Sequence, residues 1–445
     1  MHLFGSNLRR WEFWKELISF RSLVIVSPVF LLTVKHWTNL VVLIVFVGSL
    51  FFLFRNIETT HQDTYGVKKW RWIIALTFAG PVLAVGMGQS LRGEFYPSNF
   101  DAPLRIALCA PVFLAISRGW LFKEGRDPIT FLWMKYSLPF SLLWTLLYRP
   151  SWSPSWLGEN RITTYFVDVL SFGSLTFLFS LMSFASLTFF LHKLIFIHRL
   201  FISICIFAGL YLSVMSGSRS GLLALPFFLF IWIRGFAIKQ YGTKSAMLLS
   251  LLVFIFLLLF IPLQPFMVEK IKMAFSEFAS YQLNSVNQDT SVSMRISFYR
   301  MAVFYFLENP IKGWGDLGWM RLISSQEISQ YATEFTRDYA KNGFHNEVLT
   351  SAVRSGIWGL FASIFLFLIP VFFATTIQNK NVSYSVNFLA LFLLFFIVHM
   401  FVVGMVTEVT HLVFLSSFFG LSLSVMTGDI LNLLFRNVSA SASKG

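Results

Sequence analysis

Long apolar stretches separated by short polar connections dominate the chain. About twelve of these stretches are long enough, some with flanking residues, to cross a bilayer as helices of about 20 residues. They lie at residues 18–34, 39–54, 72–89, 102–117, 129–148, 165–191, 194–215, 220–238, 246–264, 348–375, 386–406 and 410–427. This pattern predicts an all-α polytopic membrane protein.

One polar segment, residues 265–347, interrupts the pattern between the ninth and tenth predicted helices. It is too long for a simple connection, and long loops of this kind usually carry function. Its first stretch repeats four apolar residues near helical spacing, Phe266, Ile271, Phe275 and Phe278. Its second stretch, residues 293–310, should form a helix that Asn309-Pro310 ends. We expect these helices to pack as a cap on the outer membrane surface.

The chain therefore divides into three predicted parts. Residues 1–264 hold transmembrane helices 1–9, residues 265–347 form the large outer loop, and residues 348–445 hold transmembrane helices 10–12 and a short cytoplasmic tail. Neither a shift in composition nor an internal repeat indicates a further domain.

Composition supports the membrane interpretation. Hydrophobic residues make up 56% of the 445 residues, charged residues make up only 13%, and the mean hydropathy is +0.68. Soluble domains carry about 25% charged residues, so lipid must solvate much of this surface. The two cysteines, Cys109 and Cys205, fall in different apolar segments, which favours ordinary packing over a disulfide.

The distribution of charge predicts the orientation. Most Lys and Arg residues of the connecting segments lie on the side that also holds both termini. This side is cytoplasmic by the positive-inside rule, which places residues 265–347 on the outer side. The same bias accounts for most of the net charge of +14. Because no basic patch alternates with aromatic residues on a soluble face, nucleic acid is not an expected partner.

Two groups of arginines on the outer side could carry chemistry. The sequence Ser-Gly-Ser-Arg-Ser-Gly at residues 216–221 places Arg219 near the membrane boundary. Its small neighbours leave Arg219 sterically open and could offer backbone N–H groups to an anion; the alternative is an arginine that snorkels at a helix end. Arg295 and Arg300 point about 140° apart on a helix, so at most one faces a given pocket, and a solvated face is the alternative.

A third group, Phe-His-Asn-Glu-Val-Leu at residues 344–349, lies where the polar loop returns to the membrane. His345 can move a proton near neutral pH, although a histidine at a helix boundary is often a surface or capped residue. Asn346 and Glu347 could orient His345, bind a sugar or cap the following helix.

Several motifs of metal and nucleotide chemistry do not occur in the chain. It has no Asp-x-Asp, His-Glu-x-x-His, P-loop or Cys-x-x-Cys sequence. Arginine can hold a phosphate or pyrophosphate by paired hydrogen bonds without a divalent ion. The sequence therefore favours anion binding by arginine and proton movement by histidine, and we expect no metal or other cofactor.

Three motifs together resemble the O-antigen ligase family, within the O-antigen ligase/polymerase superfamily. Residues 216–221 resemble its outer arginine motif, residues 294–315 its Arg…Glu-Asn-Pro-x-x-Gly-x-Gly signature, and residues 345–359 its His-Asn-x-x-Leu…Gly-x-x-Gly signature. Their order around one large outer loop adds to the resemblance. The N-terminal half resembles the family only as generic membrane helices.

This resemblance implies a bacterial inner-membrane glycosyltransferase of the lipid-linked, GT-C-like type. Such enzymes transfer O-antigen polysaccharide from undecaprenyl pyrophosphate to a sugar hydroxyl of lipid A–core on the periplasmic face, in lipopolysaccharide biosynthesis. They are described as needing neither metal nor ATP. The implied partners are the undecaprenyl-pyrophosphate-linked O-antigen donor, the lipid A–core acceptor and membrane lipids.

The resemblance also implies roles for the candidate residues. Arg219 and Arg295 would bind the donor pyrophosphate and stabilise the charge that grows on it, and Arg300 would replace Arg295 if Arg295 points away. His345 would orient or deprotonate the acceptor hydroxyl, and direct attack at the anomeric carbon implies inversion. Asn346 and Glu347 would bind substrate or orient His345.

Two other functions stay open at this point. A polymerase of O-antigen or exopolysaccharide uses the same class of donor, and the shared motifs do not separate it from a ligase. A lipid-glycan flippase or transporter also suits twelve helices. Transporters, however, tend to show repeated halves and ion sites at the membrane midplane, whereas the charges singled out here gather at the outer boundary.

Overall fold

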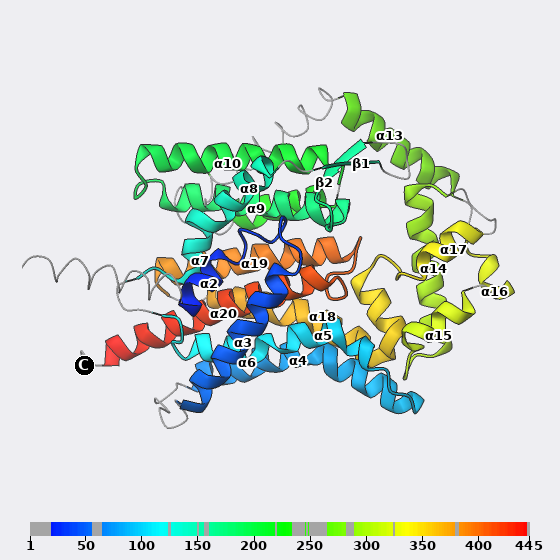
Figure 1. The fold of residues 1–445 in the computed structure, drawn as a ribbon, viewed down its shortest axis with the longest axis horizontal. Coiled ribbons are helices and arrows are strands. Elements are labelled where there is room, and N and C mark those ends of the chain that lie inside the picture. The colour runs from blue at the N-terminus through cyan, green and yellow to red at the C-terminus, as the bar shows by residue number, and fades with distance from the viewer. Residues whose placement is uncertain are drawn as a thin grey trace, which may run out of the picture.

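The computed structural model describes residues 19–55, 65–122, 126–148, 151–154, 160–218, 220–233, 245, 248, 265–281, 289–323, 325–378 and 382–442. In this part of the chain the long helices run side by side as a bundle (Figure 1). The helices of residues 265–340 stand across one end of the bundle, and the last helix, α20 (Val413–Ala442), ends at the opposite side (Figure 1).

Eight helical segments within the described residues are long and apolar enough to cross a membrane. They are α3 (Trp37–Arg55), α4 (Tyr65–Arg92), a segment made of η1 (Pro97–Phe100), α5 (Asp101–Ala107) and α6 (Cys109–Ser117), α9 (Val169–Phe190), α10 (Phe196–Met215), α18 (Glu347–Gln378), α19 (Tyr384–Gly404) and α20. Each matches one of the apolar stretches in the sequence. The prediction of an all-α polytopic membrane protein is therefore confirmed.

The stretch at residues 18–34 is not the continuous helix that its hydropathy suggests. Helix α2 (Phe20–Val26) has only seven residues, and tight i→i+3 turns follow it. Pro28 has no N–H to donate to the carbonyl of Val24, so the α-helical bonding stops there. The turn is fixed from outside, because the indole N–H of Trp37 donates to the carbonyl of Ser27 at 3.1 Å.

Three further expected spans are divided or incompletely described. Residues 129–148 are helical but consist of α7 (Ile129–Leu132), the π-helical turn η2 (Trp133–Ser137) and α8 (Leu138–Leu147). Residues 220–238 contain η3 (Leu222–Ala224) and α11 (Leu225–Trp232), and their end lies outside the described residues. Residues 246–264 lie almost wholly outside them. The total of twelve spans therefore stays a prediction.

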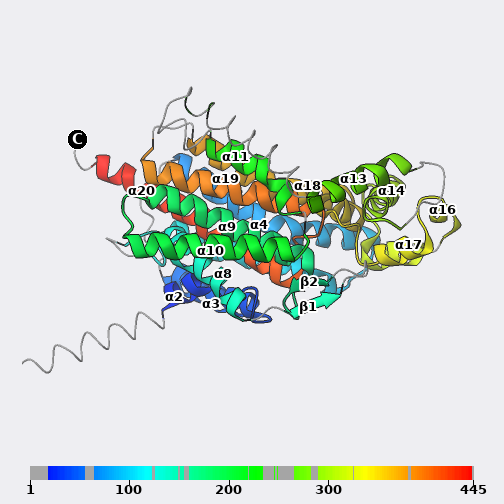
Figure 2. The same ribbon diagram turned by 90° about the horizontal axis from the view of Figure 1, so that it is seen from above.

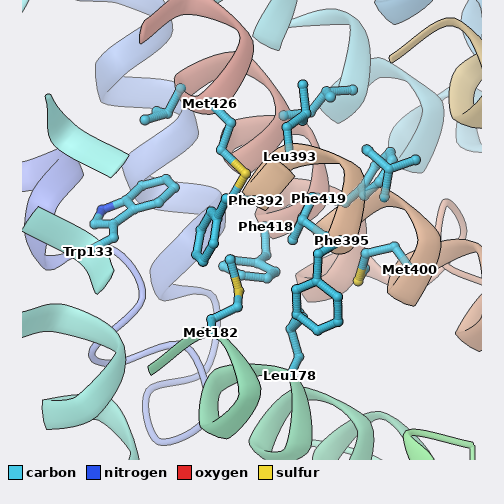
Figure 3. Close-up of a cluster of buried hydrophobic side chains, with 14 of the residues drawn as sticks. Trp133, Leu178, Met182, Phe392, Leu393, Phe395, Met400, Phe418, Phe419 and Met426 are labelled. Carbon is cyan, nitrogen blue, oxygen red and sulfur yellow. The ribbon is translucent and has the colours of Figure 1, made fainter. Parts of the chain in front are cut away.

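The core of the bundle is built from aromatic and aliphatic side chains of α9, α19 and α20. Figure 3 shows Met182 of α9, Phe392 of α19 and Phe418 of α20 pointing toward one another. The rings of Phe396 and Phe419 stack with their centroids 6.0 Å apart. Many apolar side chains on the outside of the bundle are not covered by other parts of the protein. Lipid tails can solvate such side chains.

Five helices form a cap at one end of the bundle (Figure 2). They are α13 (Pro265–Ser280), α14 (Ser291–Glu308), α15 (Gly315–Leu322), α16 (Gln326–Ser329) and α17 (Glu334–Ala340). Four of them, α14 to α17, share a hydrophobic core that also includes Val353 of α18. The core gathers Phe298, Met301 and Tyr305 of α14 around Trp319 of α15. Asn309 ends α14, as the Asn-Pro pair predicts.

The first cap helix keeps much of its apolar face uncovered. Phe275 is 71% exposed and Phe278 is 64% exposed on α13. This agrees with the expectation of a helix lying at the membrane surface. A two-stranded antiparallel sheet, β1 (Ser151–Pro154) and β2 (Asn160–Thr163), lies at the same end of the bundle as the cap (Figures 1 and 2).

Candidate active site

His345 lies in the tight turn between α17 and α18, where the cap joins the bundle. Gly343 has φ 122° and His345 has φ 49°, so both adopt the left-handed region that a histidine rarely enters. Asn346 immediately precedes α18, which begins at Glu347. Its side-chain oxygen accepts the backbone N–H of Leu349 at 3.1 Å, and its carbonyl accepts that of Thr350 at 2.9 Å. Asn346 therefore caps the helix, which was one of its open alternatives.

The ring of His345 packs in a cluster with two other aromatic rings. Phe298 and Tyr339 lie near it with centroid distances of 5.3 and 5.4 Å, and their own centroids are 6.4 Å apart, so the three rings form one cluster and the imidazole is not sandwiched. Burial, and in addition the positive charge of Arg295, lower the pKa of His345 from 6.5 to about 4. The imidazole is thus uncharged at neutral pH, where one of its nitrogens can accept a hydrogen bond from a hydroxyl.

The two arginines of α14 face different surroundings. The charge of Arg295 acts on His345. Arg300 instead donates from Nη1 to the hydroxyl of Tyr281 at 3.2 Å, and its guanidinium lies 4.9 Å from the ring centroid of Tyr331. Arg295 is therefore the arginine of this pair that accompanies His345, while aromatic rings of the cap engage Arg300.

Arg219 lies outside the described residues, so its proximity to His345 stays a prediction. The serines on either side of it are described, and they are buried. Ser218 donates to a backbone carbonyl of α9 at 3.1 Å, and Ser220 Oγ lies 2.5 Å from Ser174 Oγ on the same helix. These small residues pack the turn against α9. Whether they leave Arg219 sterically open stays a prediction, because Arg219 itself lies outside the described residues.

Glu347, the first residue of α18, is only 1% exposed. Its Oε2 accepts the backbone N–H of Thr410 at 2.9 Å, and its Oε1 accepts the hydroxyl groups of Thr410 and Ser351. His411 Nε2 lies 4.0 Å from the same carboxylate. Both carboxylate oxygens accept hydrogen bonds from the protein. Glu347 therefore joins α18 to the α19–α20 connection, and this favours a structural role over direct contact with a sugar.

Helix α18, which begins at Glu347, is interrupted at Ser355 and Gly356. Gly356 has φ 62° and ψ −146°, a conformation that essentially only glycine adopts. The turn that follows α14 satisfies the backbone groups this break releases. The N–H of Trp314 donates to the carbonyl of Val353 at 2.8 Å, and the N–H of Ile357 donates to the carbonyl of Pro310 at 2.7 Å. The segments 294–315 and 345–359 thus meet directly.

Four polar residues that the sequence analysis did not single out surround this junction: Arg354, Glu408, Thr410 and His411. Arg354 forms an ion pair with Asp316 of the cap, and its guanidinium lies 5.2 Å from the ring centroid of Trp319. Glu408 and His411 lie in the connection between α19 and α20. Ionisable residues within membrane segments are rare, so His411 inside the predicted span 410–427, with Glu408 just before it, was the signal that could have found them.

A narrow pocket with room for little more than one water molecule lies among α4, α5, α18 and the α19–α20 connection. Its polar end is lined by Glu347, Arg354 and His411, and the rest is mostly apolar. Burial, and in addition the charge of Arg354, place the pKa of His411 well below its ordinary value. Within the described residues, no three His, Cys, Asp or Glu side chains are grouped to hold a metal ion.

Comparison with known proteins shows a similarity over part of this chain. Residues 201–364 match the model of a family described as O-antigen ligase. The chain is thus similar to the O-antigen ligase family over these residues, which make up less than half of its length. The matched segment contains the turn of Arg219, all five cap helices, and the junction at His345.

A curated relative is similar over part of its length. It is an uncharacterized protein of Haemophilus influenzae, 30% identical to this chain over 184 residues. The similarity covers 41% of this chain and 44% of that protein, so the chain spans less than half of the relative's length.

Proposed function

We propose that this protein is an O-antigen ligase of the bacterial inner membrane. It would transfer O-antigen polysaccharide from undecaprenyl pyrophosphate to a sugar hydroxyl of lipid A–core, in lipopolysaccharide biosynthesis. Both termini would lie in the cytoplasm, and the cap with His345 would face the periplasm. The similarity to the O-antigen ligase family over residues 201–364 and the eight apolar helices support this proposal.

One observation carries the proposal to the level of the site. A neutral histidine and an arginine lie together where the cap meets the bundle, inside the segment matched to the family. An acceptor hydroxyl needs a hydrogen-bond acceptor, and a departing pyrophosphate needs positive charge. His345 and Arg295 supply these two groups on neighbouring elements.

The proposed reaction is a single displacement. The acceptor oxygen forms a bond to the anomeric carbon of the donor sugar while the bond from that carbon to the pyrophosphate oxygen breaks. The electron pair of the broken bond goes to the pyrophosphate, where Arg295 and Arg219 would stabilise it. His345 would align the hydroxyl and take its proton as the new bond forms. The configuration at the anomeric carbon would invert.

The histidine cannot remove the proton before the attack. Its pKa of about 4 lies far below that of a sugar hydroxyl, so the imidazole is a weak base toward it. Proton transfer must therefore be concerted with bond formation, and the main contribution of His345 would be orientation.

The test uses purified protein, an undecaprenyl-pyrophosphate-linked glycan and lipid A–core. Changing His345, Arg295 or Arg219 to Ala should lower the transfer rate at least ~100-fold, since each loss removes a transition-state interaction. Arg321→Ala is a matched control, because Arg321 is an exposed arginine of the cap. Near-normal transfer by the first three variants would exclude the assignment.

The acceptor decides between a ligase and a polymerase. A ligase joins the labelled glycan to lipid A–core in the absence of ATP. A polymerase instead extends a second lipid-linked glycan and leaves lipid A–core unmodified. A labelled lipid that only changes leaflet, with no new glycosidic bond, would indicate transport.

A further inference from the structure

The connection between α19 and α20, residues 405–412, packs against the turn that carries His345. Its backbone carbonyl at Met405 accepts the hydroxyl of Tyr299 from the cap. Further along, Thr410 binds Glu347 through both its N–H and its hydroxyl. Glu408 lies between these two attachments and contacts the histidine turn itself.

We propose that Glu408 is a positioning residue for His345, holding the 343–345 turn through Thr350. This inference rests on the proposed role of His345 in transfer. It adds to that role a side chain about sixty residues further along the chain, from a connection that carries none of the motifs in the sequence.

A chain of two hydrogen bonds joins Glu408 to the turn. The hydroxyl of Thr350 donates to Glu408 Oε1 at 2.8 Å, and the same hydroxyl accepts the backbone N–H of Phe344 at 3.1 Å. Phe344 immediately precedes His345 and is fully buried. The bond from Phe344 to Thr350 therefore fixes the peptide between Gly343 and Phe344, next to His345.

The carboxylate of Glu408 also shapes the turn by contact. A Cβ atom at Gly343 would overlap Glu408 Oε1. The chain passes so close to the carboxylate at this position because Gly343 has no side chain, and its φ of 122° suits glycine. His345 holds an unfavourable conformation, which persists only where its surroundings determine it.

The protonation of Glu408 is sensitive to ordinary changes of pH, because the residue is buried and has charged neighbours. Burial raises the pKa of Glu408 from 4.5 to about 7. Arg354 and the hydroxyl of Thr350 oppose this rise, while Glu347 and Asp316 add to it. Above pH 7 the carboxylate is ionised and accepts a charge-assisted bond from Thr350. Below pH 7 it becomes neutral and the bond weakens.

The first experiment measures transfer against pH for the wild type, Glu408→Gln and Glu408→Asp. The wild-type kcat should fall below a midpoint near pH 7. Glu408→Gln should lose that inflection and show a kcat about tenfold lower at pH 8, with the acceptor KM changed less than twofold. Glu408→Asp should recover part of the pH dependence. Glu327→Gln, which changes an exposed glutamate of α16, should behave as wild type.

The second experiment removes the bridge instead of the carboxylate, in case Glu408→Gln fails to fold. Thr350→Ser keeps the hydroxyl and should transfer at nearly the wild-type rate. Thr350→Val leaves the N–H of Phe344 without its acceptor, so its kcat should fall about tenfold. Equal rates for these two variants would overturn the inference.

The outcomes separate this inference from the proposed function. If His345→Ala is inactive while Glu408→Gln keeps the wild-type kcat and pH profile, the positioning role fails and the proposed function stands. If His345→Ala transfers normally, the proposed role of His345 in transfer fails and the positioning role of Glu408 fails with it.

Discussion

At the scale of single residues, the surroundings of His345 set its chemistry. Two neighbouring rings bury the imidazole and the charge of Arg295 opposes its protonation. Its left-handed backbone is a further cost, of about 1–3 kcal/mol, that the rest of the protein must offset. These features together keep a neutral hydrogen-bond acceptor at a fixed place.

The state of His345 can be measured directly by ¹⁵N NMR of histidine-labelled protein, with His345→Gln used to assign its signal. We expect the ring to titrate near pH 4. Arg295→Met removes the repulsive charge and should raise this pKa, though not to 6.5, because burial remains. A wild-type pKa at or above 6.5 would contradict the proposed arrangement.

The same shift has a consequence for stability. An unfolded chain binds a proton at His345 with its ordinary pKa of about 6.5, whereas the folded protein does so only near pH 4. The unfolded state therefore binds more protons between these values. The contribution of His345 to the free energy of unfolding decreases as the pH falls through this window.

At the scale of elements, hydropathy predicted the long helices but not the break in α18. Glycine is frequent in membrane helices, so Gly356 in an apolar run gives no warning of a left-handed residue. The break depends on Pro310 and Trp314, which supply backbone partners from the cap. The end of the motif at residues 294–315 therefore has a structural role, which is to bind the backbone groups released by the break in α18.

Gly356→Ala should damage this junction. An added Cβ would lie 2.6 Å from the carbonyl oxygens of Pro310 and Ile311, in a conformation that alanine does not favour. We expect a loss of stability of about 2–4 kcal/mol, measured as a lower Tm in detergent, together with loss of transfer. Gly86→Ala, within α4, meets only an ordinary contact at 3.9 Å and should leave the Tm nearly unchanged. Equal Tm values for the two variants would contradict the role of the break.

At the scale of the whole molecule, the described residues form two hydrophobic cores, one in the bundle and one in the cap. The sequence predicted the cap as a set of amphipathic helices. It could not predict that Glu347 meets Thr410 or that Thr350 meets Glu408, because these pairs lie about sixty residues apart and follow no periodic pattern. The candidate site was therefore predictable at His345 and Arg295, but not in the residues that support them.

Trp319→Ala tests the independence of the two cores. Trp319 is fully buried in the cap, and its loss should destabilise the cap by about 3–5 kcal/mol. Limited proteolysis with mass spectrometry should then show faster cleavage within residues 265–347, while the bundle stays intact and transfer is lost. Trp358→Ala is the control, since Trp358 is 40% exposed on α18. Simultaneous cleavage throughout the chain would indicate a single cooperative unit instead.

The backbone bonds between the 310–314 turn and the break in α18 also bear on how substrates arrive. Raising the cap at this junction would separate Trp314 from Val353 and Ile357 from Pro310, leaving four backbone groups without partners. The Arg354–Asp316 ion pair would separate with them. A route that opens the cap like a lid is therefore costly. Entry sideways, from the plane of the bilayer, would leave these bonds in place and would suit the lipid-linked donor and acceptor proposed above.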